Sequence, residues 1–381
     1  MAVSTATGRG CGKLYIVGEY AVMDPQGLAV LAGVDRFLTA TVTPSLFDDR
    51  GRIYSSYYGA DGREFFCASD GRKGSYGTDI AGRAIELAYG IIESRGAVAE
   101  AVDIRIDSGL DDSVTGKKYG LGSSGAVAVA VIRAVTAAHG VELSALEVFK
   151  AAYVATVRAG AKGSAGDIAC SSHGGVVLYR RPDVDVAQEL IDADPIGAVF
   201  ANWPGLILDS REDLAGLDFL VGWTGTPVKT DEQLAAAEKA ARNAADATSA
   251  HDEKVREFVD ASATVAKKLW EAARVGDTEQ IEEQIRCSRK LLAGYADLKG
   301  LQIETPLLAS LADIAAHNGA VGKSSGAGGG DCGIALAGTG ADTGTILAQW
   351  CDAGIEPLAL SIAPRFSGTA LGQIKPASEN A

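Results

Sequence analysis

The sequence predicts an α+β protein of two domains. Dividing its 381 residues by about 150 residues per domain gives between two and three domains. Strand patterns dominate the start of the chain, whereas long helical patterns rich in Ala, Glu, Lys and Arg dominate its second half. Hydrophobic residues make up 47% of the chain, which is enough apolar material to build two cores. We expect the domains to divide at 1–190 and 191–381.

The first half mixes strands, hairpins and helices. The patterns predict strands at 13–17, 28–42 and 101–106, hairpins within 51–77, and a helix over 79–94. The apolar run 125–139 is too long for a strand and predicts a buried helix, for which Ser123 or Ser124 could supply the N-terminal cap. Ser144 and Glu147 form the capping box of the following helix.

The second half is dominated by helices. Weak periodicity and three prolines place the passage between the domains within 180–217. Strands are predicted at 219–223, 332–337 and 358–362, and helices at about 231–247, 253–275, 277–296, 305–318 and 345–351. The glycine-rich segment 319–330 interrupts this pattern.

Charge and cysteine spacing exclude several classes of protein. The 35 basic and 49 acidic residues give a net charge of −14, so nucleic acid is not an expected partner. The six cysteines form no C-x-x-C pair, which favours free thiols in the cytoplasm. No signal peptide and no apolar stretch of about 18 residues is found, so no membrane partner is expected. Monomer and homodimer both stay open.

Three glycine-rich loops are the candidate functional segments. The first, 120–126, opens a predicted helix, where backbone N–H groups can bind phosphate. It also matches the dinucleotide pattern G-x-G-x-x-G, but a polar segment precedes it instead of a buried strand, and a plain capped helix is an open alternative. The second, 319–331, contains Gly-Lys-Ser but has His317 where a Walker A loop requires glycine.

The third loop, 160–169, places the carboxylate of Asp167 after small residues. Such a carboxylate can orient a nucleophile or balance a lysine, and an ordinary helix cap is the alternative. Five lysines lie in or beside predicted loops of this acidic protein: Lys13, Lys117, Lys118, Lys162 and Lys323. Together they predict a local positive pocket for an anion, and with the glycine loops they indicate phosphoryl transfer.

Three segments resemble the motifs of the GHMP kinases. They are 13–22 (KLYIVGEYAV), 120–126 (GLGSSGA) and 325–331 (SGAGGGD), in the order typical of that family. The resemblance implies a ribosomal-S5-like N-terminal domain and a ferredoxin-like C-terminal domain, with the active site between them. It also implies ATP and Mg²⁺ as cofactor and metal.

Within the family, the chain is most similar to the phosphomevalonate kinases. Gly-Glu-Tyr at 18–20, the segment 163–169 and the segment 222–230 carry this likeness. It implies ATP-dependent conversion of 5-phosphomevalonate to 5-diphosphomevalonate in the mevalonate pathway of isoprenoid biosynthesis. The alternatives are mevalonate kinase, another small-molecule kinase of the family, the related diphosphomevalonate decarboxylase, or a non-catalytic ligand-binding regulator of the same fold.

The resemblance also implies roles for individual residues. Lys13 and Asp167 would be catalytic, and Ser124 would reach the metal. The ATP phosphates would be held by Gly120, Leu121, Gly122, Ser123, Ser124, Gly125 and Ala126. The substrate would contact Lys13, Lys118, Ser164, Asp167, Thr230, Gly326, Ala327 and Gly328. Many relatives carry an acid or His and a Gln where this chain has Thr156 and Gly160, so no carboxylate ligand for Mg²⁺ is identified.

Overall fold

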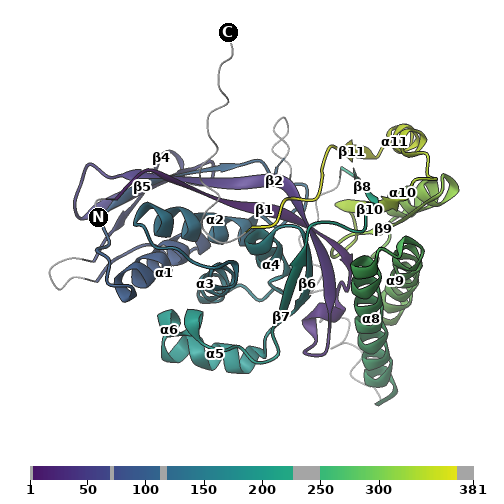
Figure 1. Ribbon diagram of the computed structural model, residues 1–381, viewed down its shortest axis with the longest axis horizontal. Coiled ribbons are helices and arrows are strands. Elements are labelled where there is room, and N and C mark those ends of the chain that lie inside the picture. Colours follow the sequence, from purple (N-terminus) through teal and green to yellow (C-terminus); the bar gives the residue numbers. More distant parts are fainter. Residues whose placement is uncertain (1–2, 69–72, 112–117, 226–248, 367–381) are drawn as a thin grey trace, which may run out of the picture.

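The computed structural model describes residues 3–68, 73–111, 118–225 and 249–366. Their strands form two separate sheets, each packed against its own helices (Figure 1). This arrangement confirms the predicted α+β class. Among the helices in these ranges, none combines the length and the apolar character that crossing a membrane requires.

The larger sheet has seven strands and is almost entirely antiparallel. Its members are β1 (Ala6–Val17), β2 (Ala29–Pro44), β3 (Arg50–Ser55), β4 (Gly59–Phe66), β5 (Val102–Ser108), β6 (Val176–Arg180) and β7 (Ile207–Arg211). They run in the order β4-β3-β5-β2-β6-β7, with β1 paired along β2, and only β3 and β5 are parallel. The long strand β2 therefore joins both halves of this sheet.

Helices cover the sheet around a central buried helix. They are η1 (Ala21–Met23), α1 (Ile80–Ser94), α2 (Ser123–Ala138), α3 (Ala145–Arg158), α4 (Gly166–His173), α5 (Val184–Ala193) and α6 (Pro195–Phe200). Helix α2 contacts β1, β2 and the helices α1, α3 and α4. It approaches β1 through glycine, because a Cβ at Gly10 would lie 2.5 Å from the carbonyl oxygen of Ala126. Glycine in β1 thus brings the first strand directly against α2.

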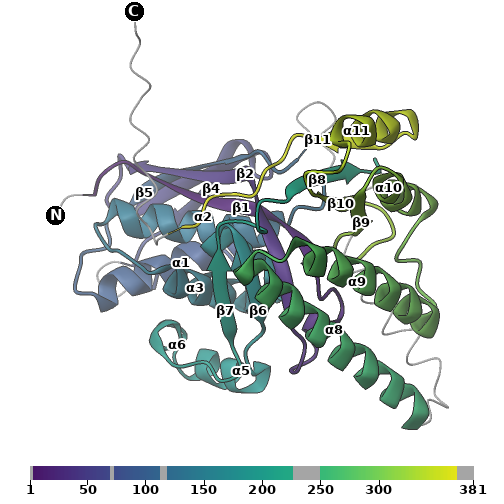
Figure 2. The same ribbon diagram turned by 45° about the vertical axis from the view of Figure 1, so that its right-hand side comes forward.

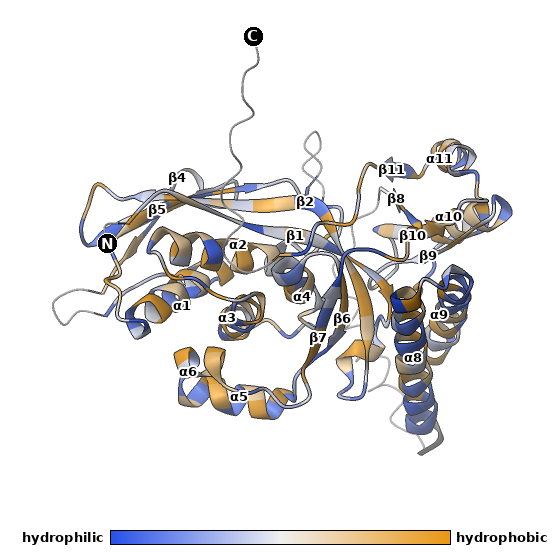
Figure 3. Cartoon of the chain, in the orientation of Figure 1, coloured by the Kyte–Doolittle hydropathy of each residue, from blue (hydrophilic) through white to orange (hydrophobic). Residues whose placement is uncertain are grey.

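The smaller sheet is antiparallel and has the order β11-β8-β10-β9. Its strands are β8 (Asp218–Trp223), β9 (Ala320–Ser324), β10 (Cys332–Ala337) and β11 (Glu356–Leu358). The helices in this half of the chain are α8 (Ser249–Val275), α9 (Thr278–Lys299), α10 (Pro306–His317) and α11 (Thr343–Asp352), of which α8 packs on α9 and also contacts β1, β2 and η1. Figure 2 shows α8 and α9 side by side as a long hairpin next to this sheet. Hydrophilic residues gather along α8 (Figure 3), as expected for a helix with one solvent-facing side.

Several predictions about local structure can now be assessed. The capping box of Ser144 and Glu147 is confirmed, with both reciprocal hydrogen bonds formed. The expected serine cap of α2 is wrong, because Gly122 occupies the cap position and neither Ser123 nor Ser124 caps the helix. The segment 180–217, expected to be irregular, contains α5, α6 and β7. The helix predicted at about 231–247 lies outside the described residues.

The chain changes sheets between β7 and β8, that is, between Arg211 and Asp218. The domain boundary at residues 190 and 191 stays a prediction. The segment 359–366 then leads back from the smaller sheet to the larger one, where Ile362 bridges to Val34 and the Gly175 N–H donates to the Ala363 carbonyl at 2.9 Å. The two halves of the molecule are therefore linked by the chain twice.

Candidate active site

The first glycine loop turns the chain into the N-terminus of α2. Gly120 and Gly122 adopt left-handed backbone conformations with φ of 77° and 82°, which glycine adopts without steric cost. The N–H groups of the first helical turn have no partners within the helix, and the cap residue Gly122 has no side chain to satisfy them, so that of these amides the Gly125 N–H is bound by Asp167 from α4. Ser124 is exposed there, and Ser123 is partly exposed. The loop therefore presents amides, hydroxyls and the positive end of a helix dipole to an anion.

Lys13 and Asp167 lie directly against this loop. The Lys13 ammonium donates to the Gly120 carbonyl at 3.1 Å, and the Gly125 N–H donates to Asp167 Oδ2 at 3.0 Å. A Cβ built on Gly122 would lie 2.8 Å from Cβ of Asp167 and 3.1 Å from Cγ of Lys13. A lysine from β1 and an aspartate from α4 thus flank the start of α2.

The third motif, 325–331, reaches the same place from the smaller sheet. A Cβ on Gly326 would lie 3.9 Å from the Lys13 ammonium nitrogen. The Ser325 hydroxyl donates to the Tyr15 carbonyl at 2.9 Å, and the Tyr20 hydroxyl donates to the Ala327 carbonyl at 2.5 Å. Strand β1 and the segment after it therefore hold this loop, so that all three glycine segments converge around Lys13.

A buried ion pair fastens the two sheets together beside these loops. Lys323 on β9 and Glu19 just after β1 are 0% and 2% exposed at their side chains, and Lys323 Nζ lies 2.5 Å from Glu19 Oε1. Lys323 also donates to the Ser324 carbonyl, whereas Glu19 Oε2 is buried without a hydrogen-bond partner in the described residues. The expectation that Lys323 contributes to an open anion pocket is therefore wrong, because its ammonium group is buried and neutralised by the Glu19 carboxylate.

Ser164 contacts the site through two tyrosines. The Tyr15 hydroxyl and the Ser164 hydroxyl lie 2.8 Å apart, and the Tyr179 hydroxyl donates to the Ser164 carbonyl at 2.7 Å. The Lys13 ammonium lies 5.6 Å from the centroid of the Tyr15 ring. Tyr15 thus lies between Ser164 and Lys13, and the substrate contact expected for Ser164 stays a prediction.

Three residues near the site adopt positive φ although they are not glycine. They are Tyr20 (φ 61°) in the segment 13–22, Ala165 (φ 63°) in the loop 160–169 and Asp331 (φ 52°) at the end of the loop 319–331. Such conformations cost free energy and persist only where the surroundings enforce them. Their clustering is typical of a functional site.

Other expected site residues are placed less closely. Lys118 is exposed and forms an isolated bridge with Asp111, and no described contact joins it to Lys13. Lys162 is exposed on the loop before Ser164. Gly328 lies on the far side of its loop, where a Cβ would meet the Ile303 carbonyl at 2.2 Å. Thr230 and Lys117 lie outside the described residues.

Four residues around the loops were given no site role by the sequence. Tyr15, Glu19 and Tyr20 belong to the segment 13–22, but nothing in the spacing indicated that they bind Ser164, Lys323 and Ala327. Asp331 lies against the first glycine loop, since a Cβ on Gly120 would be 2.5 Å from Asp331 Oδ2. Only its position at the end of the third motif could have drawn attention to it.

Burial and charge act in opposite directions on Asp167. Removal from water raises the pKa of its carboxyl, while the Lys13 ammonium and the N–H groups of Ile168 and Gly125 lower it in part. The pKa stays above the ordinary aspartate value. Lys13 is thus the main described cation that stabilises the ionised form of Asp167.

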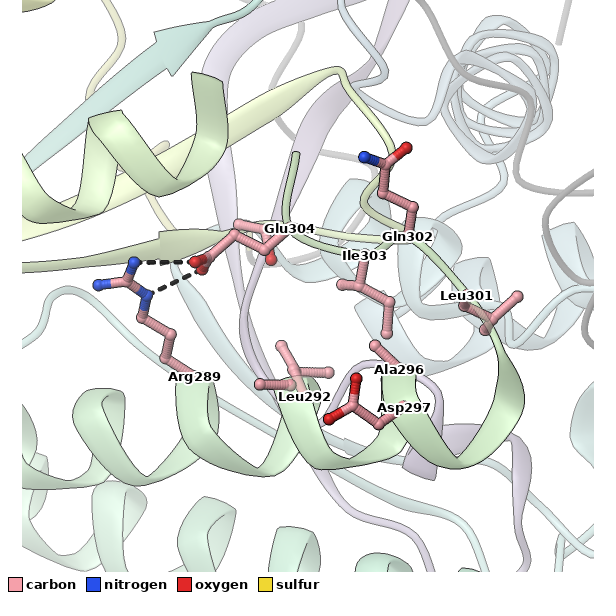
Figure 4. Close-up of a pocket in the computed structure, with 10 residues that line it drawn as sticks. Arg289, Leu292, Ala296, Asp297, Leu301, Gln302, Ile303 and Glu304 are labelled. Atoms are coloured by element: carbon pink, nitrogen blue, oxygen red, sulfur yellow. Dashed lines mark hydrogen bonds and ion pairs between the residues drawn. The ribbon is translucent and has the colours of Figure 1, made fainter. Parts of the chain in front are cut away.

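A pocket of about 230 Å³ lies behind the third motif (Figure 4). Leu292, Ala296 and Asp297 rise from α9 and face Ile303 on the following loop, while Arg289 forms a bidentate ion pair with Glu304 at one end. The Ile303 carbonyl accepts the Gly329 N–H at 2.8 Å. The loop that lines this pocket therefore contacts the third motif through Ile303.

The donor groups at the start of α2 suit a magnesium ion held largely by phosphates. No group of three or more His, Cys, Asp or Glu side chains gathers as a metal site among the residues with described positions. Mg²⁺ commonly keeps several waters and takes one or two protein ligands together with substrate phosphates. The exposed hydroxyl of Ser124 fits such a partial ligand set.

Comparison with known proteins agrees with this geometry. Residues 81–175 match the model for the GHMP kinases N terminal domain. The phosphomevalonate kinase of Streptomyces sp. (strain CL190) is 35% identical over 364 residues, which cover 92% of this chain and 95% of that protein.

Solved structures show the same architecture. A Listeria innocua protein has a TM-score of 0.82 and 30% identity, covering 96% of this chain and 100% of its own. The Streptococcus pneumoniae phosphomevalonate kinase in complex with phosphomevalonate and AMPPNP has a TM-score of 0.77 and 29% identity, covering 94% and 99%. This chain belongs to the GHMP kinase family, on its phosphomevalonate kinase branch.

Proposed function

We propose that this protein transfers the γ-phosphoryl group of ATP to the phosphate of 5-phosphomevalonate, giving 5-diphosphomevalonate and ADP. The observation that carries the proposal is the convergence of Lys13, Asp167 and two glycine loops at the N-terminus of α2. The relatives named phosphomevalonate kinase, one of them bound to phosphomevalonate and an ATP analogue, support this choice of substrate.

Each group then has a role set by its chemistry. The amides of 120–125 and the dipole of α2 hold the ATP phosphates. Lys13, which reaches both glycine loops, offsets the repulsion between the nucleotide and an acceptor that is itself an anion. Ser164, Gly326 and Ala327 line the acceptor side of Lys13, with Lys118 and Thr230 as further expected contacts.

No strong general base is required for this reaction. The second pKa of a phosphate monoester is about 6, so the attacking oxygen is already largely deprotonated at pH 7. That oxygen forms a new bond to the γ-phosphorus as the bond to the bridging oxygen breaks and ADP leaves. We assign Asp167 two roles: it orients the acceptor, and its negative charge helps to hold the Lys13 ammonium group in place. Its carboxylate is hydrogen-bonded to Gly125 and interacts electrostatically with Lys13.

Mg²⁺ belongs to the same proposal. When bound, it would neutralise charge on the β- and γ-phosphates, with Ser124 as the protein ligand. The chain's own part is to present the Ser124 hydroxyl at the helix start, where it is exposed. We also propose a cytoplasmic location, with the choice between monomer and homodimer left to measurement.

Acceptor specificity tests the proposal. Purified protein is assayed for ADP release with ATP and Mg²⁺ and with either 5-phosphomevalonate or mevalonate, with Lys13→Met as the control for contaminating kinases. Turnover with phosphomevalonate alone is expected. Turnover with mevalonate instead would make the protein a mevalonate kinase, and binding of ATP without ADP release for either acceptor would favour a regulator.

A further inference from the structure

Arg133 is a buried cation at a distance from the candidate active site. It lies on α2, ten residues after Ser123, which is about 15 Å along the helix from the phosphate-binding end. Its exposed fraction is only 3%. Burying a guanidinium costs free energy unless its N–H groups are satisfied, so its partners indicate what it is for.

Those partners come from two other elements. Arg133 Nη1 donates to the Arg9 carbonyl on β1 at 2.6 Å and to the Ser171 carbonyl on α4 at 3.2 Å. Arg133 Nη2 donates to the Ser172 carbonyl at 2.6 Å. No carboxylate pairs with it in the part of the chain that the structure describes, although the ring of Phe366 lies 4.6 Å from its guanidinium carbon. One side chain thus joins α2, β1 and α4.

Each of these three elements carries one part of the candidate site. The glycine loop opens α2, Lys13 lies four residues beyond Arg9 on β1, and Asp167 lies in the first turn of α4. The carbonyls that Arg133 binds on α4 belong to its last turn, where a cation complements the helix dipole. Helix α4 is regular from Asp167 to Ser172, so fixing its last turn also fixes its first. Strand β1 has a register shift between Cys11 and Gly12, so Arg133 restrains the Arg9 side of this irregularity and Lys13 lies just beyond it.

Strand β1 and helix α2 are in direct backbone contact beside this link. A Cβ at Gly8 would lie 2.2 Å from the Ala130 carbonyl oxygen, so the strand and the helix touch through backbone there, with no side chain between them. The guanidinium is a planar fork that can serve several carbonyls at once, whereas a lysine ammonium is a single point charge. Arginine therefore serves the three carbonyls better than lysine, which could reach only some of them.

We propose that Arg133 is a positioning residue for phosphoryl transfer: it fixes β1 and α4 against α2, and thereby sets Lys13 and Asp167 against the glycine loop. The proposal rests on the function proposed above for the reaction itself. The part of the proposal that concerns the positions of α2 and α4 does not depend on which acceptor the protein phosphorylates. Burial lowers the pKa of Arg133 to about 10, so the side chain stays charged at neutral pH.

Two variants of Arg133 and one matched control test this role. Lys150 on α3 is also a buried cation, 7% exposed, and donates to the Ala201 carbonyl at 2.6 Å, but it binds none of the elements that carry the site. Arg133→Met is expected to lower kcat roughly tenfold to a hundredfold, as small misplacements of reacting groups do, with the KM for ATP changed less than about threefold. Arg133→Lys should recover part of kcat, and Lys150→Met should leave kcat within about twofold.

Hydrogen exchange supplies a readout that does not need turnover. The Gly125 N–H, which donates to Asp167 Oδ2, is expected to exchange about tenfold faster in Arg133→Met than in the wild type or in Lys150→Met. Wild-type kcat and wild-type exchange at Gly125 in a folded Arg133 variant would overturn the proposal. If Arg133→Met does not fold, Arg133→Lys is measured in the same way. Absence of wild-type turnover with phosphomevalonate would contradict the proposed function, while the exchange comparison would still decide the role of Arg133.

Discussion

The first and third glycine motifs have similar compositions but are held in place by different means. The first, 120–126, opens α2, so its amides gain their orientation from a buried helix. The third, 325–331, connects β9 and β10 and is fixed by hydrogen bonds to Tyr15 and Tyr20 and by the neighbouring Glu19–Lys323 pair. Glycine content alone therefore predicts a close approach to a ligand, whereas the surrounding elements decide which groups the loop presents.

Lys13 is the residue at which the two motifs meet, so removing it should have the largest effect. Lys13→Met is expected to lower kcat about 10³-fold, because the charge that offsets two polyanions is lost. The fold should survive, since this side chain is only partly buried. The ADP-release assay measures kcat, and a thermal melt of the same preparation measures stability. A loss below tenfold would contradict the role assigned to Lys13.

The third motif can be disturbed separately through its ion pair. Glu19→Gln leaves the buried Lys323 ammonium without its counter-charge and is expected to destabilise the protein by about 3–5 kcal/mol. Urea denaturation measures this change in the free energy of unfolding. The double variant Glu19→Met with Lys323→Met removes both charges and should recover at least half of the loss. An unchanged urea midpoint for Glu19→Gln would contradict this interpretation.

Asp167→Asn separates activity from stability at the first motif. Burial raises the pKa of Asp167, so the folded state binds this proton more tightly than the unfolded state does, and ionising the group lowers stability as pH rises through the raised pKa. At pH 7 the amide should therefore leave the melting temperature unchanged or higher. Activity should fall by less than about 10²-fold, because no obligatory base is removed. A larger loss with unchanged substrate binding would show that Asp167 acts as a base.

The geometry of the first motif can be tested with matched glycines. Gly122 and Gly300 both have positive φ, 82° and 63°, but a Cβ at Gly122 would crowd Asp167 and Lys13, whereas none of the described atoms lies within 4 Å of a Cβ at Gly300. Gly300→Ala should cost about 1–2 kcal/mol of stability for the left-handed backbone alone, and Gly122→Ala should cost more, because its Cβ would also displace Asp167. Only Gly122→Ala is expected to raise the KM for ATP, by roughly tenfold for about 1.4 kcal/mol of lost binding. Equal KM values for the two variants would contradict the phosphate-binding role of the loop.

A substitution outside both motifs should have the smallest effect. Ser144→Ala removes the capping box of α3 and is expected to cost about 1 kcal/mol in urea denaturation, with kcat unchanged. It shows whether a general loss of stability alone affects turnover. A fall in kcat in this variant would mean that the activity losses above cannot be assigned to the motifs.

Local chemistry explains why some of the structure was predictable. Helices such as α1, α3 and α10 carry their own periodicity and caps, and the structure reproduces them within a few residues. The elements α5, α6 and β7 are hard to predict because the prolines of this segment resemble helix breaks, although Pro195 occupies the first turn of α6, where proline is favoured. Strand β9 was missed because a glycine and a lysine interrupt its apolar run.

The amino-acid sequence by itself determined the α+β class, most elements and the three glycine motifs, because turns, caps and periodicity are encoded within a few neighbouring residues. Only the tertiary structure decided which charges meet. Lys323 pairs with Glu19 across 304 positions, and Arg133 reaches Arg9 across 124. The energy of a buried charge depends on the groups that replace water around it, and those groups come together only when the chain folds.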